Sequence, residues 1–386
     1  MSARARIIFH IGQHKTGSKA LQSFCAHNAR GLAERGILYP VEENPAHGIR
    51  AYAISHYRLF ALLRAEVMAA CGDAGGAEKY RAAHREFCRP FGTLRGMFDA
   101  MEEERARAGA GTMLISAEDL FDMRSAHELE FSMEWVEAGA QILAATAAEF
   151  RYEPLTVVYL RRQDHLLAAH YVQFIKGSAT NDAGFDDFSR AFAPRLRSRD
   201  ILAAWAGAFG DARVRARAYE PCALPAGIVP DSFEHVLGFP VPADWGAPAR
   251  DVESVNATPG RDYVEFMRLL NRRGKQGIAV PPREQVLQAA FAETNRTGAG
   301  EWMSPGARRE LLAIHAAGNA EIAERFTGRD GAPFFAEPVP ADDGEWRQYP
   351  GLSQGRIEAI ERKIGGQAVR WENGWKKKLA RLLRRA

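Results

Sequence analysis

The stretch that decides the fold is residues 6–22, RIIFHIGQHKTGSKALQ. Its first part, residues 6–12, is rich in β-branched and aromatic residues and ends in glycine, which is typical of a buried strand. From Ser18 the apolar residues recur every three or four positions, which indicates a helix that ends near Gly36. A strand, a loop and a helix in this order predict an anion site, because the loop N–H groups and the helix N-terminus point at the same place.

The loop of residues 12–19, GQHKTGSK, differs from the phosphate loop of nucleotide triphosphatases. Two glycines have the spacing of G-x-x-x-x-G-K-[ST], but Ser18 stands where that motif has its lysine. Lys19 is followed by Ala20, so the hydroxyl that would hold Mg²⁺ is missing. A nucleotide kinase or NTPase is therefore the alternative hypothesis, which Mg²⁺-dependent ATP turnover would support.

Further strands are expected downstream, separated by helical segments. The segments with strand composition are ILYP (37–40), TMLIS (112–116), LTVVYL (155–160) and VRARAYE (214–220). Strands that alternate with helices favour an α/β fold with a parallel sheet covered on both faces. We expect one such domain over residues 1–369, with a helical insertion at 41–110, where Ala, Arg and Glu dominate.

The composition is that of an ordinary globular protein. The chain has 386 residues, 46% of them hydrophobic, enough for a core without disulfide or metal staples. The cysteines form no C-x-x-C pair, so we expect reduced thiols; they are Cys25, Cys71, Cys88 and Cys222. There is no export signal and no run of 18 apolar residues, so the sequence predicts a cytoplasmic protein.

The C-terminal tail, residues 370–386, carries a net charge of +6, which leaves −3 on the rest of the chain. A basic tail on an acidic body is not the composition of a nucleic-acid-binding protein. Trp371, Trp375 and Leu379 begin a helical stripe that continues through Leu382 and Leu383. A basic amphipathic helix is typical of contact with an anionic membrane surface, here the inner face. The alternative is a last helix docked on the protein body.

The segment HIGQHKTGSKALQ (10–22) resembles the first signature of the sulfotransferases that use PAPS (3′-phosphoadenosine 5′-phosphosulfate), in their bacterial, glycan-type branch. In that family a strand is followed by K-[STG]-G-[ST] and a helix on a P-loop-like sheet. The resemblance implies that Lys15 reaches the oxygen between phosphate and sulfur. It also implies that the following residues line the donor site: Thr16, Gly17, Ser18, Lys19 and Ala20.

Residues 157–173, VVYLRRQDHLLAAHYVQ, resemble the second signature of the same family. The resemblance implies that Arg161 is the ligand of the donor's 3′-phosphate. Independently of the family, arginines at the carboxyl end of an apolar strand suit phosphate binding. The family usually has a serine eight residues later, where this chain has Ala169. The missing contact would come from a neighbour, namely Arg162, His170 or Lys176. The alternative is that both arginines pair with acids on covering helices.

The attacking acceptor needs a base, and the best candidate is Glu118 in TMLISAEDLF (112–121), a segment similar to the family's Ser-x-Glu. A carboxylate at the end of this strand would face the same crevice as Lys15. The alternative is that Glu118 only begins the next helix. His14 is the rival base, since an imidazole titrates near neutrality. His10 is expected to be a core residue.

The resemblance implies transfer of a sulfuryl group from PAPS to a hydroxyl or amine, with PAP as product and no metal. We expect a carbohydrate acceptor, with a small molecule as the alternative. A non-catalytic member that binds nucleotide or glycan is the third hypothesis, because of Ala169.

Overall fold

The structure is a computed structural model. It describes residues 4–40, 55–126, 128–246, 259–291, 302–327, 332–338, 341, 344 and 346–365. The expectations for the tail of residues 370–386, and for residues 41–54 at the start of the predicted insertion, lie outside the described residues.

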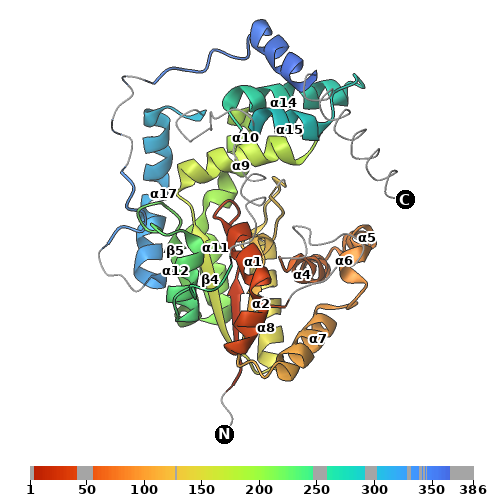
Figure 1. Ribbon diagram of the computed structural model, residues 1–386, viewed down its shortest axis with the longest axis vertical. Coiled ribbons are helices and arrows are strands. Elements are labelled where there is room, and N and C mark those ends of the chain that lie inside the picture. The colour runs from red at the N-terminus through yellow and green to blue at the C-terminus, as the bar shows by residue number, and fades with distance from the viewer. Residues whose placement is uncertain are drawn as a thin grey trace.

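A central sheet of five parallel strands organises the fold, in the order β2-β3-β1-β4-β5 (Figure 1). The strands are β1 (Arg6–His10), β2 (Ile37–Leu38), β3 (Thr112–Ser116), β4 (Glu153–Leu160) and β5 (Val214–Ala218). The first strand is central, and its last residue His10 pairs in register with Ser116 on one side and Val157 on the other. The predicted α/β class and parallel sheet are confirmed.

Helices cover both faces of the sheet, as expected from the alternation of side chains along a strand. Ile8 and Tyr159 face α1 (Ser18–His27), α2 (Ala29–Glu34), α12 (Ile228–Ser232) and the turn η4 (Phe233–Leu237). Ile7, Phe9 and Val158 face the opposite layer. That layer contains α4 (Tyr57–Ala70), α8 (Met133–Glu149), α11 (Ser198–Phe209) and α17 (Pro305–Phe326).

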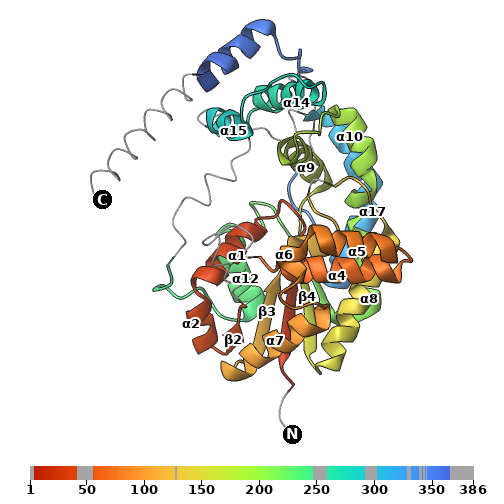
Figure 2. The same cartoon turned by 90° about the vertical axis from the view of Figure 1, so that its right-hand side faces the viewer.

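The described part of the predicted insertion is helical. After α4 come α5 (Ala74–Ala83), α6 (Arg85–Cys88) and α7 (Leu94–Arg107). These helices lie beside α8 on one flank of the sheet (Figure 2). Asp73 separates α4 from α5 and caps α5, because its side chain accepts a 2.8 Å hydrogen bond from Gly76 N–H.

A second hydrophobic cluster lies beyond the carboxyl edge of the sheet. It is built by α9 (Gln163–Gly177), α10 (Phe185–Phe192), α14 (Arg261–Lys275), α15 (Arg283–Phe291) and the helical residues 354–365. The helix α9 connects the two bodies, because it starts directly after β4 and then packs on α10 and α14 (Figures 1 and 2). The short turns η1 (Glu118–Leu120), η2 (Ala193–Leu196) and η3 (Asp211–Arg213) complete the described elements.

Two local details test the expected helix boundaries. The helix predicted to run to Gly36 breaks at Asn28, whose side-chain Nδ2 donates to Phe24 O at 2.9 Å and competes with the helical hydrogen bonds. Ser304 caps the start of α17, since its Oγ accepts from Ala307 N–H at 3.1 Å.

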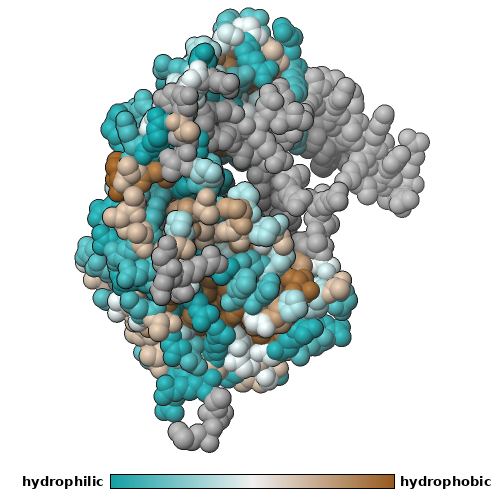
Figure 3. All heavy atoms as spheres, turned by 90° about the vertical axis from the view of Figure 1, so that its left-hand side faces the viewer, coloured by the Kyte–Doolittle hydropathy of each residue, from teal (hydrophilic) through white to brown (hydrophobic). Residues whose placement is uncertain are grey.

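The face on the α17 side is mostly hydrophilic (Figure 3). None of the helices that the structure describes is long and apolar enough to cross a membrane. The four cysteines are free thiols, two of them buried.

Candidate functional site

The loop between β1 and α1 has an unusual backbone conformation. Lys15 and Gly17 both have left-handed φ angles, 67° and 79°. Thr16 Oγ1 donates to Gln13 O at 2.6 Å and closes the loop on itself. Gly12 is required by close approach, because a Cβ there would lie 2.5 Å from Glu118 Cα. The strand–loop–helix arrangement expected from the sequence is present.

The loop has hydrogen-bond donors that the protein does not use. In the described part of the chain, no acceptor pairs with the backbone N–H groups of residues 14–18. The hydroxyl of Ser18 is buried and likewise lacks a partner among the described residues. Buried donors without partners are costly. An anion at the start of α1 would satisfy them together.

Lys15 points from this loop toward α9. Its Nζ donates to Gln173 Oε1 at 3.0 Å. Burial, followed by the charges of Lys176, Lys19 and Arg161, lowers the Lys15 pKa to about 7, with Glu118 opposing the shift. Several cations therefore surround one ammonium, which is an environment that favours an anionic ligand.

Arg161 lies against the same loop from the end of β4. Its Nη1 donates to Lys15 O at 3.1 Å, and its backbone N–H donates to Gln13 Oε1 at 3.0 Å. The guanidinium is 5.9 Å from the centre of the Tyr219 ring, and that ring also contacts the loop at Gly17. Burial lowers the Arg161 pKa. The two predicted donor-binding residues are thus brought together, as the neighbouring positions of β1 and β4 require.

Arg162 does not take part in this cluster. Its side chain is buried and forms two hydrogen bonds with Asp164, with Nε–Oδ1 at 2.8 Å and Nη2–Oδ2 at 3.0 Å. It also contacts Glu337, so the alternative of pairing with acids is correct for this arginine. In this structure Arg162 therefore pairs with acids and does not contact the loop of residues 12–19.

The other two substitutes differ in position. His170 is buried between His14 and Phe192, with ring centres 5.7 and 4.5 Å away, and burial lowers its pKa well below the ordinary value. Lys176 is one helical turn beyond Gln173 on α9 and contributes charge at Lys15. Ala169 stays partly exposed and offers no polar group.

Glu118 begins η1, as the alternative hypothesis stated, and it also belongs to the site. Its Oε2 accepts a 2.6 Å hydrogen bond from Gln22 Nε2 on α1. Burial raises the Glu118 pKa, whereas the charge that His14 carries when protonated, the Gln22 hydrogen bond and the charge of Lys19 lower it, and the pKa lies below its ordinary value. The carboxylate is therefore ionised near neutral pH, which is the state that a base requires.

His14 is held in one tautomer by its neighbours. Its Nε2 donates to Arg124 O at 3.0 Å, because a carbonyl can only accept, so Nδ1 of the neutral ring carries the lone pair. Asp119 Oδ1 lies 3.6 Å from the same Nε2. Burial is the main cause that lowers the His14 pKa. For Asp119, burial and the charge of Glu118 raise the pKa well above its usual range. A neutral His14 suits the role of a base as Glu118 does.

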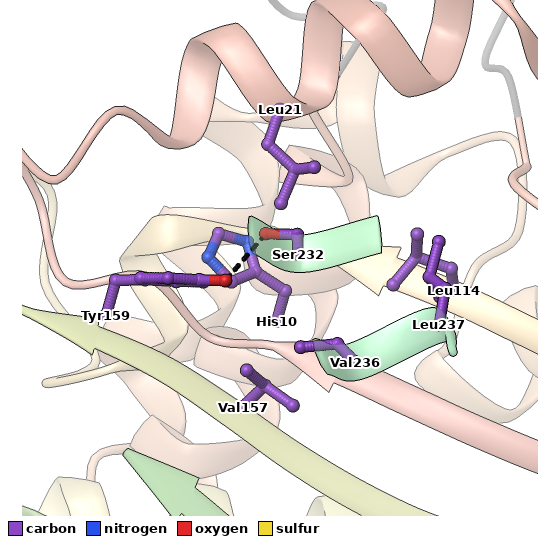
Figure 4. Close-up of a pocket in the computed structure, with 8 residues that line it drawn as sticks. All are labelled: His10, Leu21, Leu114, Val157, Tyr159, Ser232, Val236 and Leu237. Atoms are coloured by element: carbon purple, nitrogen blue, oxygen red, sulfur yellow. Dashed lines mark hydrogen bonds between the residues drawn. The ribbon is translucent and has the colours of Figure 1, made fainter. Parts of the chain in front are cut away.

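His10 lies outside the cluster formed by Lys15 and Arg161. It lines a small pocket under α1 and α12 with Tyr159, Ser232 and five apolar residues (Figure 4). Its Nδ1 pairs with Ser116 Oγ at 2.7 Å, whereas its Nε2 has no partner among the described residues. Burial lowers its pKa to about 4, so the ring is neutral, as expected of a core residue. Lys15 and Arg161 do not line this pocket.

Three glutamines of the site were not found from the sequence. Gln13 binds the Arg161 backbone, Gln22 binds Glu118, and Gln173 binds Lys15. A neutral amide has no sequence signal of its own. Only Gln22 could have been suspected, because it follows Ser18 by one helical turn.

Comparison of the chain with protein-family models, with curated proteins and with solved structures finds no match.

Proposed function

We propose that this protein binds PAPS and transfers its sulfuryl group to a hydroxyl or amine acceptor. The observation that carries the proposal is the meeting of Lys15 and Arg161 at a loop whose N–H groups and Ser18 hydroxyl lack partners in the described chain. These groups are all donors or cations, as a nucleotide with several phosphate and sulfate oxygens requires.

The roles divide by position. Bound PAPS would supply a sulfuryl group on a phosphate leaving group. The acceptor oxygen or nitrogen forms the new bond to sulfur, the bond from sulfur to the bridging oxygen breaks, and the acceptor proton passes to Glu118. Lys15 stabilises the charge that develops on the leaving phosphate, and the loop N–H groups hold its other oxygens. Arg161 holds the 3′-phosphate. His14 is the alternative proton acceptor.

The acceptor we propose is a carbohydrate. The four free cysteines suit a reducing compartment, so we propose that the reaction takes place in the cytoplasm.

The first test is calorimetry with PAP in the presence of a chelator. We expect binding without metal, and transfer from PAPS that Lys15→Ala abolishes. Lys79→Ala, at an exposed position on α5, is the matched control and should leave both unchanged.

Three other results would each point elsewhere. No heat with PAP at high concentration excludes the donor. Hydrolysis of ATP that requires Mg²⁺ favours the kinase or NTPase hypothesis. Binding of PAP without transfer to any acceptor in a broad glycan and small-molecule panel favours a non-catalytic, nucleotide-binding member.

A further inference from the structure

Three arginines lie at the segment that links β3 to α8, and they differ in their partners. Arg64 on α4 forms two 2.8 Å hydrogen bonds with the carboxylate of Glu128. Arg195 is buried, and its Nε donates to Asp122 Oδ2 at 2.6 Å. Arg124 has no comparable partner, because no residue that the structure describes accepts a hydrogen bond from its guanidinium.

The guanidinium of Arg124 lies against an aromatic ring in place of an acid. Its Cζ is 4.0 Å from the centre of the ring of Trp135, which belongs to the first turn of α8. Arg124 is only 6% exposed, and its Nε is sealed from solvent without a partner in the described chain. The two Nη atoms are not sealed in this way. A cation–π contact offsets only part of the cost of removing a guanidinium from water, so an acceptor at the Nη atoms would stabilise it.

The charges near Arg124 leave its guanidinium poorly compensated. Burial and then the charge of Arg64 lower the Arg124 pKa. Three acids oppose this shift, namely Glu128, Glu130 and Asp122. The first and the last of them are already paired with the other two arginines, and Glu130 is exposed to solvent. Because a guanidinium stays charged in proteins, a nearby anion would stabilise it directly.

The backbone of Arg124 contacts the candidate site. Its carbonyl oxygen accepts the 3.0 Å hydrogen bond from His14 Nε2, and His14 directly precedes Lys15. Glu118 lies on the same segment, at the carboxyl end of β3. The helix α8 begins at this edge of the sheet, since it leads back to the start of β4 at the opposite edge. A ligand at Arg124 would therefore lie beside the loop of Lys15 but would use different groups.

We propose that Arg124, stacked on Trp135, binds a carboxylate or sulfate group through its two Nη atoms. A guanidinium fork matches either oxyanion with two parallel hydrogen bonds. The ring fixes the plane of the fork, so the direction of the bound group is defined. This site goes beyond the proposed function and does not depend on PAPS, because neither residue belongs to the donor loop. The oxyanion is an acidic group of a substrate or a free ion, and the test separates these two sources.

The test follows the NMR signal of the Arg124 Nε–H in the full-length protein with isotope-labelled arginine. Its absence from the spectrum of Arg124→Lys assigns the signal. Sodium glucuronate, a sulfated disaccharide and sodium sulfate are titrated, with sodium chloride at equal ionic strength and glucose as controls. We expect saturable shifts with the oxyanions and none with chloride or glucose. Binding of a saccharide anion that is tighter than inorganic sulfate by about tenfold or more assigns the site to a substrate, because the sugar adds contacts. Equal affinity assigns the site to a free ion.

Calorimetry with sodium glucuronate, in the presence of PAP, compares matched variants. Arg124→Gln should weaken binding by about tenfold or more, as expected when one partner of a charge pair is truncated. Arg124→Lys should lie between the two, because an ammonium keeps the charge but lacks the fork. This variant also serves if Arg124→Gln does not fold. Arg30→Gln, at an exposed position on α2, should have no effect. PAP affinity of Arg124→Gln should stay within about twofold.

Absence of a saturable shift with every oxyanion, or an equal shift with glucose, would overturn this inference. Full glucuronate affinity in Arg124→Gln would also overturn it. A loss of PAP affinity in that variant equal to its loss of glucuronate binding would assign Arg124 to the donor, which contradicts a separate site. Failure of PAP to bind the unaltered protein would defeat the proposed function and leave this inference standing, because the NMR titration contains no PAP.

Discussion

The ammonium of Lys15 and the side-chain amide of Gln173 meet across the site, with Nζ 3.0 Å from Oε1. The two residues are 158 positions apart in the chain, one on the loop after β1 and the other on α9. The amide oxygen is neutral, so it orients the ammonium without cancelling its charge. Because burial and nearby cations also hold the Lys15 pKa at about 7, this group gains or loses a proton easily near neutrality.

The first prediction concerns proton uptake on donor binding. In the free protein at pH 8 the Lys15 side chain is neutral in most molecules, since its pKa is about 7. A bound anion favours the charged form and raises this pKa, so PAP binding at pH 8 should take up a proton. Calorimetry in two buffers of different ionisation enthalpy measures this uptake. Lys15→Met should reduce it, and identical heats in both buffers would contradict the prediction.

The same pKa sets a stability trend in the absence of ligand. The folded-state pKa of Lys15 is depressed below the ordinary 10.5, so the unfolded chain binds more protons between about pH 7 and 10.5. The contribution of this group to stability therefore improves as pH rises through that window and is least favourable below pH 7. Urea unfolding of Lys15→Met should show a shallower rise over the same range, and parallel curves would contradict the assignment.

A third prediction separates Arg161 from Glu118 by kinetics. Arg161→Ala should weaken PAP binding by about 2–4 kcal/mol and raise the donor KM, because the proposed role of the guanidinium is to contact the donor before and during transfer. Glu118→Gln should lower kcat by roughly 100- to 10,000-fold with PAP affinity nearly unchanged, because the carboxylate acts when the proton moves.

Glutamine has the same size as Glu118, so this variant should keep its fold. An unchanged melting temperature is the control. If Glu118→Gln keeps near-full turnover, Glu118 is not the base. The base would then be His14, and His14→Asn should lower kcat instead.

A fourth prediction uses two neighbouring hydroxyls of the loop. Ser18 Oγ is buried without a partner in the described chain, so Ser18→Ala should leave the free protein as stable or slightly more stable while weakening PAP binding. Thr16 Oγ1 donates to Gln13 O, so Thr16→Val should cost about 1–3 kcal/mol of stability. Unfolding and PAP titration of both variants check this pair. Unchanged PAP affinity in Ser18→Ala would show that its hydroxyl does not face the ligand.

A fifth prediction concerns the buried acid beside Arg162. Burial raises the pKa of Asp164, but hydrogen bonds and charges from Arg162, His165 and Arg308 lower it to about 2. With a depressed carboxylate pKa, its stabilising contribution is present above about pH 4 and is lost as pH falls through 2. Asp164→Asn should therefore destabilise the protein by about 3–5 kcal/mol at pH 7, by leaving buried arginine charge unpaired.

The control for this variant is Asp187→Asn, which removes an exposed pair with Arg190 and should cost less than about 1 kcal/mol. Urea unfolding at pH 7 and at pH 3 compares the two. A cost for Asp164→Asn that does not shrink with falling pH would refute the assigned role.

The sequence by itself determined the sheet and the meeting of Lys15 and Arg161 in the candidate site. Strand composition and helical periodicity are local properties, so β1, β3, β4 and β5 could be predicted from their residues. Lys15 and Arg161 could be placed together because both follow parallel strands, whose carboxyl ends share one edge. The expected single helix up to Gly36 was wrong at Asn28, where a side-chain hydrogen bond competes with the helix.

Only the tertiary structure decided which neighbours each functional group has. Arg161 and Arg162 are adjacent in the chain, yet one contacts the loop and the other pairs with Asp164, because successive residues at a strand end point in different directions. Gln173 and Lys176 became part of the site through the path of α9, which Asn271 and Arg283 hold from distant helices. Such contacts depend on packing across long stretches of chain, and no local sequence pattern encodes them.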